Sequence, residues 1–151
     1  PNLRGRSIIA NIKCERLEKL FLDLKNSLAP DSDYFFLDSS LSMIVTYGNK
    51  YNFASRFSEF ECIETTNNLL KSSLINWLWI DTFNNFPINE TNFKSINSLK
   101  IKKCLTSPDL LGRPQDIKKY AEIIKNYDFK LDAICCKNKN INLWEELLIN
   151  H

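Results

Sequence analysis

The stretch Leu74-Ile75-Asn76-Trp77-Leu78-Trp79-Ile80-Asp81 decides the fold class. It is short, continuous and apolar apart from Asn76 and the final Asp81, and it is rich in aromatic and β-branched residues, which is typical of a strand buried on both faces of a sheet. After it, Pro87 and Asn89-Glu90-Thr91 favour the start of a helix that carries Phe93, Ile96 and Leu99. The stretch and its sequel therefore predict one strand–helix unit.

The same alternation continues in both directions along the chain. Further strands are predicted at residues 7–13, 33–40, 51–58, 100–107 and 131–136. The helices between them are predicted at residues 15–28, after Ser40 with Gly48 at the C-terminal end, at 64–72, from Pro114 onward, and at 142–149. In the first helix the apolar residues fall on one face, which we expect to pack in the core; they are Leu17, Leu20, Phe21, Leu24 and Leu28.

The connections between these strands are too long for hairpins, so they predict parallel strands joined by right-handed crossovers and a single α/β domain over residues 1–151. Two architectures remain open. One is an incomplete or truncated (β/α)8 TIM barrel, and the other is an open doubly wound parallel sheet. The chain has 3 glycines and no Gly-rich loop, so it offers no phosphate-cradling turn that would favour the second.

Composition limits the function classes. The chain has 151 residues, with 20 Lys and Arg against 18 Asp and Glu, and a net charge of +2. So small a charge lacks the basic footprint of a nucleic-acid-binding protein. No apolar run reaches the roughly 18 residues that a membrane-spanning helix needs. The 5 cysteines form no Cys-x-x-Cys pair, which favours reduced thiols in a cytoplasmic protein.

Polar residues follow nearly every predicted strand, at the end where parallel βα proteins carry their chemistry. Lys13 and Arg56 are of the types that hold a phosphate. Glu59 and Asp81 are the carboxylates best placed to bind a hard cation or to move a proton. Asp81 is a charged residue directly after a buried strand, so it either pairs with a structural Arg or Lys or belongs to the site. For Lys13, the alternative is a solvated lysine at the edge of the sheet.

Four segments together resemble the later βα units of the glycerophosphodiester phosphodiesterase-like family, within the phospholipase-C-like phosphodiesterase superfamily of (β/α)8 barrels. They are residues 8–13, 56–59, 79–83 and 106–113. The resemblance implies a phosphodiester substrate, a divalent cation (Ca²⁺ or Mg²⁺) bound by acidic residues, and two histidines acting as acid and base. A Glu-x-Lys pattern of the family matches Asn11-Ile12-Lys13, where the amide of Asn11 is a weaker metal ligand than a carboxylate.

The His-Arg-Gly motif, the paired Glu and Asp, and the second histidine of the family have no match here, and His151 is the one histidine of the chain. The resemblance therefore implies the C-terminal portion of a barrel whose opening units lie upstream or on another chain, with no hydrolysis by this portion alone. The residues that it assigns are Lys13, Glu59 and Asp81 to catalysis, Asn11, Lys13, Arg56, Ser107 and Arg113 to a phosphorylated glycerol or sugar ester, and Glu59 and Asp81 to the metal. The alternative function is a non-catalytic phosphate-ester binding or assembly module.

Overall fold

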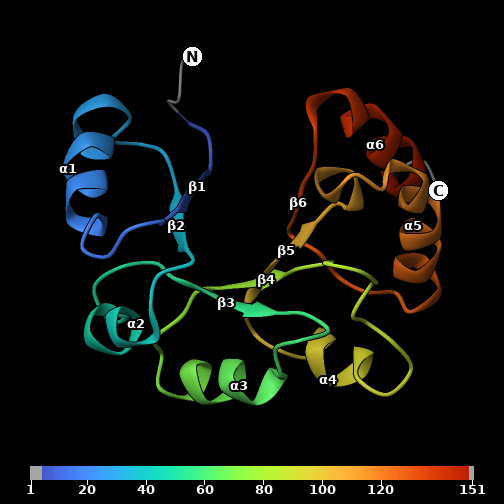
Figure 1. The fold of residues 1–151 in the computed structure, drawn as a ribbon, viewed down its shortest axis with the longest axis horizontal. Coiled ribbons are helices and arrows are strands. Elements are labelled where there is room, and N and C mark those ends of the chain that lie inside the picture. The colour runs from blue at the N-terminus through green and yellow to red at the C-terminus, as the bar shows by residue number, and fades with distance from the viewer. Residues whose placement is uncertain (1–4, 150–151) are drawn as a thin grey trace. The chain divides into compact units, whose positions relative to one another are not determined.

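The structure is a computed structural model that describes residues 5–149, and it alternates strands with helices along the chain (Figure 1). The strands are β1 (Ile8–Asn11), β2 (Tyr34–Leu37), β3 (Ala54–Phe57), β4 (Trp77–Ile80), β5 (Lys102–Thr106) and β6 (Ala133–Cys135). The α-helices are α1 (Glu18–Leu28), α2 (Leu41–Tyr47), α3 (Ile63–Lys71), α4 (Phe93–Asn97), α5 (Ile117–Asn126) and α6 (Ile141–Ile149). Every predicted strand and helix thus has its counterpart.

The strands form two parallel sheets. In the first, β1 pairs with β2, with Ile8 opposite Tyr34. The second has the order β3-β4-β5-β6, and in it β5 pairs with β6 with Thr106 opposite Cys135. The predicted class, α/β with parallel strand–helix units, is confirmed. Whether these units belong to a barrel stays a prediction.

The chain divides into two compact units. The first unit comprises the residues up to Ser55 together with Thr65–Trp77, and the second comprises Arg56–Glu64 and the residues from Leu78 onward. The boundary falls within β3, α3 and β4. None of the helices in residues 5–149 is both long and apolar enough to cross a membrane.

The core of the second unit lies between its strands and its helices. Leu78 and Ile80 of β4 and Leu105 of β5 are fully buried against Ile117 and Tyr120 of α5. Because side chains alternate between the two faces of a strand, Trp79 and Asp81 point to the face opposite Leu78 and Ile80. The strand that decides the fold therefore sends apolar residues toward the helices and delivers Asp81 to the other face.

In the first unit, aromatic residues provide most of the packing. The Phe35 ring stacks on Trp77 at 4.7 Å between centroids, and Phe36 lies 5.4 Å from Phe53. Phe35, Phe36, Phe53 and Trp77 are all buried. Trp77 therefore packs in the core of the first unit.

Helix α1 is rotated relative to the expectation from its apolar stripe. The prediction that its leucines pack in the core is wrong. Leu17, Leu20, Leu24 and Leu28 are exposed by 41%, 65%, 58% and 59%. The helix instead turns Phe21 toward β2, 5.4 Å from Phe36 and 6.0 Å from Tyr34, and buries Glu18. The aromatic contacts and the hydrogen bond of Glu18 to Ser39 decide the orientation.

Two local predictions about helix ends are confirmed. Ser40 caps α2, since its Oγ accepts the backbone N–H of Met43 at 3.4 Å, and Gly48 follows the last turn. Gly48 also lies close to a neighbouring segment: a Cβ there would be 2.5 Å from the carbonyl oxygen of Leu74. Between the predicted strand at residues 100–107 and the predicted helix from Pro114 lies a 3₁₀ turn (η1, Pro108–Leu111), and Pro114 begins a second one (η2, Pro114–Asp116) that leads into α5.

Candidate functional site

Arg56 lies at the carboxyl end of β3 among two carboxylates and an aromatic ring, and we name Arg56, Glu61, Asp81 and Phe83 the Arg56 cluster. Nε of Arg56 is 3.8 Å from Oδ2 of Asp81 and 3.9 Å from Oε2 of Glu61. Its Cζ is 5.7 Å from the centroid of the Phe83 ring, which is a cation–π distance. Since the Arg56 side chain is 26% exposed, a solute can approach it.

Asp81 is the buried carboxylate of this cluster, with 8% of its surface exposed. Its Oδ1 accepts the backbone N–H of Thr82 at 2.9 Å, and its Oδ2 accepts the indole N–H of Trp79 at 3.2 Å. These donors and Arg56 compensate the cost of burying the charge. Asp81 therefore has the cationic partner that its position demands, and that partner is itself a predicted site residue.

Glu59 binds the loop that follows β4. Its Oε1 accepts the backbone N–H of Asn85 at 3.1 Å and also that of Asn84. Burial raises the pKa of Glu59, but hydrogen bonds from backbone N–H groups, above all that of Asn84, outweigh burial and hold the pKa below its usual value. An ionised carboxylate of this kind is a poor proton donor at neutral pH, so the predicted catalytic role of Glu59 gains no support from its geometry.

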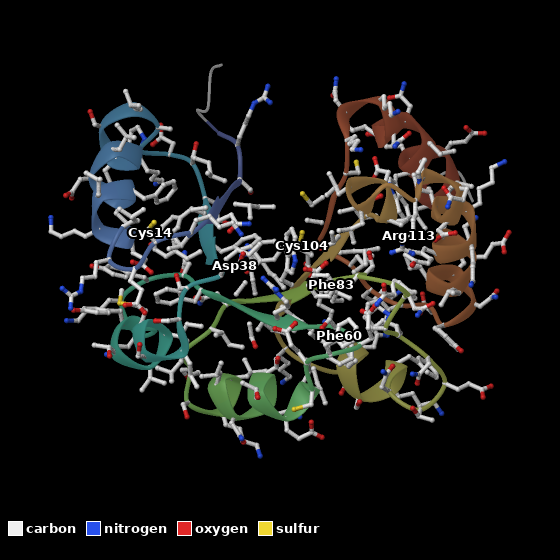
Figure 2. All side chains as sticks on the ribbon, viewed as in Figure 1. Cys14, Asp38, Phe60, Phe83, Cys104 and Arg113 are labelled. Atoms are coloured by element: carbon white, nitrogen blue, oxygen red, sulfur yellow. The ribbon has the colours of Figure 1, made fainter. Side chains whose placement is uncertain are left out.

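Arg113, labelled in Figure 2, binds the carbonyl oxygens of the same loop. The guanidinium donates to the carbonyl oxygens of Thr82, Phe83 and Asn84, to the Asp116 carboxylate and to the Tyr120 hydroxyl. Such a spread of partners uses the planar fork of an arginine, which a lysine does not have. The described contacts of Arg113 thus fix a loop, and its predicted contact with an ester stays a prediction.

Ser107 and Asp109 join the segment after β5 to the segment after β6. Ser107 is fully buried and its Oγ accepts the indole N–H of Trp144 at 2.9 Å. Asp109, 1% exposed, accepts the backbone N–H of Lys137 at 3.1 Å and the side-chain amide of Asn140. Burial raises the pKa of Asp109. Hydrogen bonds from Ser107, Asn140 and Lys137 lower the pKa by more than burial raises it, so the pKa lies below its usual value. The predicted ester contact of Ser107 is not tested by these bonds.

Two predicted site residues, Asn11 and Lys13, belong to the first unit, whereas Arg56, Glu59, Asp81, Ser107 and Arg113 belong to the second. Asn11 ends β1 with its side chain exposed. Lys13 follows it and forms an ion pair with Asp38, with Nζ 2.7 Å from Oδ2. A joint action of Lys13 and Arg56 on one phosphate stays a prediction.

A pocket of about 500 Å³ lies beside the Arg56 cluster in the second unit. The turn after β3 lines one side with Ser58, Glu59 and Glu61, and the segment before α4 contributes Asn89 and Asn92. Glu61 belongs to both the pocket and the cluster. A ligand in the pocket would therefore meet hydroxyl, amide and carboxylate groups next to an arginine.

Glu61, Phe60 and Phe83 are the site residues that the sequence analysis did not assign. Ser58 Oγ donates to Glu61 Oε2 at 2.8 Å and accepts the Phe60 N–H at 3.1 Å, which forms a tight turn. The turn exposes Phe60 by 71%, with its ring centroid 6.0 Å from that of Phe83 (Figure 2). The Ser-x-x-Glu spacing at residues 58–61, directly before α3, was the available signal, because this spacing is typical of a helix start.

The carboxylates predicted to bind a divalent cation are largely engaged by hydrogen-bond donors, and the cation stays a prediction. Oε1 of Glu59 accepts backbone N–H groups, whereas its Oε2 is buried with no hydrogen-bond partner among the described residues, and both oxygens of Asp81 face N–H donors or Arg56. A hard cation requires several oxygen ligands that are not already turned toward positive groups. Within residues 5–149, no cluster of three or more His, Cys, Asp or Glu side chains could hold a metal ion.

Comparison with known proteins adds no relative to this picture. The sequence matches no family model, and neither the curated proteins nor the solved structures gave a match. The glycerophosphodiester phosphodiesterase-like resemblance is therefore carried by the four quoted segments alone.

Proposed function

We propose that this chain is a recognition domain for small phosphorylated glycerol or sugar esters, built from phosphodiesterase-like strand–helix units, and that its described residues bind such an ester without hydrolysing it. The supporting observation is the Arg56 cluster: a partly exposed guanidinium lies 3.8 Å and 3.9 Å from two carboxylates and 5.7 Å from an aromatic ring. The cluster offers both a cation and hydrogen-bond acceptors at one strand end.

Each part of the cluster suits a different part of such an ester. The guanidinium of Arg56 suits the phosphate, because its planar donors match phosphate oxygens. Glu61 suits the hydroxyl groups of a glycerol or sugar, since a carboxylate accepts hydrogen bonds from hydroxyls. The exposed rings of Phe60 and Phe83 suit the C–H face of a sugar. An ester has hydroxyl groups for Glu61 as well as a phosphate for Arg56, so the ester should bind better than inorganic phosphate.

Hydrolysis is the weaker alternative. The family mechanism uses two histidines, and the chain has His151 alone, which lies outside the described residues. Glu59, the predicted proton carrier, has a pKa below its usual value. We also propose that the protein works in the cytoplasm with reduced thiols, because each cysteine of residues 5–149 is free.

The test is calorimetric titration of the chain with glycerol 3-phosphate, inorganic phosphate and glycerol. The ester is expected to bind most tightly, and Arg56→Met to weaken it by about tenfold or more, the loss of one to two charge-assisted hydrogen bonds. Lys119→Met, which removes a charge from the exposed side of α5, serves as the matched control and should bind as the unchanged chain does. Equal affinity of the Arg56→Met variant, or no saturable binding of the ester, would refute the proposal.

A second assay decides between recognition and hydrolysis. The chain is incubated with a chromogenic phosphodiester in the presence of Mg²⁺ or Ca²⁺, and no release above background is expected. Release that disappears in the Glu59→Gln variant would establish the hydrolytic alternative instead.

A further inference from the structure

Glu18 is a buried carboxylate with one oxygen that has no hydrogen-bond partner among the described residues. It is the first residue of α1 and is 1% exposed. Its Oε1 accepts the hydroxyl of Ser39 at 2.8 Å, whereas Oε2 is buried and unpartnered. An uncompensated buried carboxylate destabilises a fold by several kcal/mol, so a donor for Oε2 would be bound favourably.

Glu18 lies where two pockets of the first unit meet. The larger, of about 560 Å³, lies between the first turn of α1 and helix α2 and has Glu18, Tyr47 and Tyr51 in its wall. The smaller, of about 130 Å³, is lined by Glu18 with Lys13, Cys14 and Asp38, from the loops that follow β1 and β2. Figure 2 labels Cys14 and Asp38. Glu15 also lines both. The unpartnered carboxylate thus borders enough space for a small molecule.

The charges around the larger pocket favour a cationic donor. In the larger pocket Lys19 is bound to Asp23 at 2.8 Å, and in the smaller pocket Lys13 is bound to Asp38 at 2.7 Å, so both lysines already have carboxylate partners. Arg16 is exposed, whereas Glu18 is the buried charge of the wall. The deepest charge that a ligand meets is therefore negative.

The aromatic wall supports the same assignment. The rings of Tyr47 and Tyr51 stack on each other with centroids 5.6 Å apart, and both line the larger pocket. An aromatic face attracts an ammonium group within roughly 6 Å. A carboxylate and two aromatic rings in the wall of one pocket form an environment that suits an aliphatic ammonium better than a neutral alcohol.

We propose that the pocket between α1 and α2 binds a small aliphatic amine, whose ammonium group donates to Oε2 of Glu18 and whose carbon chain lies along Tyr47. The site is separate from the Arg56 cluster and does not depend on the proposed ester recognition. The pocket volume suits a free small amine, and the chemistry requires a primary ammonium with donors to spare.

The probes are 1,4-diaminobutane, 1-butanol and glycerol, titrated into the chain at neutral pH and low ionic strength and followed by NMR chemical shifts and by thermal unfolding. The diamine is expected to bind saturably and to raise the unfolding temperature, because a ligand of the folded state stabilises it. The two neutral probes should do neither. If 1-butanol or glycerol binds as tightly as the diamine, or if the diamine does not saturate, the proposal is overturned.

Glu18→Gln is expected to weaken diamine binding by about tenfold or more, the loss of one charge-assisted hydrogen bond. The matched control is Glu122→Gln, which removes the same charge from an exposed position of α5 and should leave the affinity unchanged. Tyr47→Leu, which keeps Glu18, is expected to weaken the diamine as well and decides the matter if the Glu18 variant does not fold. Unchanged affinity in both pocket variants would show that the amine binds elsewhere.

Discussion

Glu59 and Arg113 hold the two sides of one residue, since the Glu59 carboxylate accepts the backbone N–H of Asn84 while the Arg113 guanidinium donates to the Asn84 carbonyl oxygen at 2.8 Å. Their other bonds extend over neighbouring peptide groups, to Asn85 on one side and to Phe83 on the other. The loop that carries Phe83 into the Arg56 cluster is thus fixed through both its donors and its acceptors.

This arrangement predicts coupling between Glu59 and Arg113. Glu59→Gln keeps the size of the side chain but removes its charge, and we expect it to lower the free energy of unfolding by about 1–3 kcal/mol. Arg113→Lys should cost a similar amount, because one ammonium cannot serve carbonyls so widely spread. Since both residues hold one loop, the double variant should lose less than the sum, measured by urea unfolding. Strict additivity would show that the two act independently.

The second prediction concerns the loss of stability at acidic pH, to which Asp109 contributes. Its folded-state pKa lies below the usual 3.8, so the stability it contributes is present above that value and is lost as the pH falls through the folded-state pKa. The pKa of Glu59 is likewise below its usual value of 4.5, so Glu59 also contributes stability that is lost at acidic pH. The unfolding temperature of the unchanged chain should fall between neutral and acidic pH. In the Asp109→Asn variant this fall should be smaller, and the free energy of unfolding at neutral pH should be lower by about 2 kcal/mol. If the unfolding temperature of this variant falls with pH as steeply as that of the unchanged chain, the contribution of Asp109 is contradicted.

The thiols should react in a fixed order. Burial raises the pKa of Cys104 to about 12, with a smaller contribution from Cys135, so that roughly one thiol in ten thousand is ionised at pH 8. Cys14 and Cys62 are exposed and should be alkylated first. Mass spectrometry of the chain during iodoacetamide treatment checks the order, with urea-unfolded protein as the control. Labelling of Cys104 as fast as Cys14 in the folded chain would contradict its burial.

Helix α1 provides a fourth prediction, which compares its two faces. Leu24→Gln should change the free energy of unfolding by no more than about 0.5 kcal/mol, because the side chain is 58% exposed. Phe21→Ala should lower it by about 2 kcal/mol, because the ring packs against Tyr34 and Phe36. Urea unfolding measures both. A larger loss for Leu24 than for Phe21 would mean that the leucine side is the one that packs.

The strand–helix alternation could be predicted because its signals are local. The apolar run at β4, the hydroxyl of Ser40 before α2 and Pro114 before α5 each bias the backbone within a few residues. The rotation of α1 could not be predicted this way. Phe21 lies at the edge of the leucine stripe, and the rotation that buries Phe21 and Glu18 but exposes the leucines depends on Tyr34 and Phe36, which a periodicity count does not include.

The candidate site was predictable only in part, for a related reason. That Asp81 needs a cation follows from the buried strand it ends, and Arg56 at the end of the preceding strand is that cation. The bonds of Glu59 and Arg113 to the loop after β4 are long-range and involve backbone groups that any residue carries. Side-chain type alone therefore suggested ligands where the folded chain uses the same groups to position a loop.

The close approach of Gly48 to Leu74 has a consequence for how this gene tolerates change. A single methyl group at position 48 would lie 2.5 Å from the Leu74 carbonyl oxygen and 2.7 Å from that of Ile44, and both are main-chain atoms that no rotamer can move aside. Gly5 differs in this respect, because a Cβ there would meet no atom within 4 Å, although its φ of 69° disfavours most side chains. In a library of random variants selected for expression, codon 48 should keep glycine, while codon 5 should also accept residues such as Asn that tolerate a left-handed backbone.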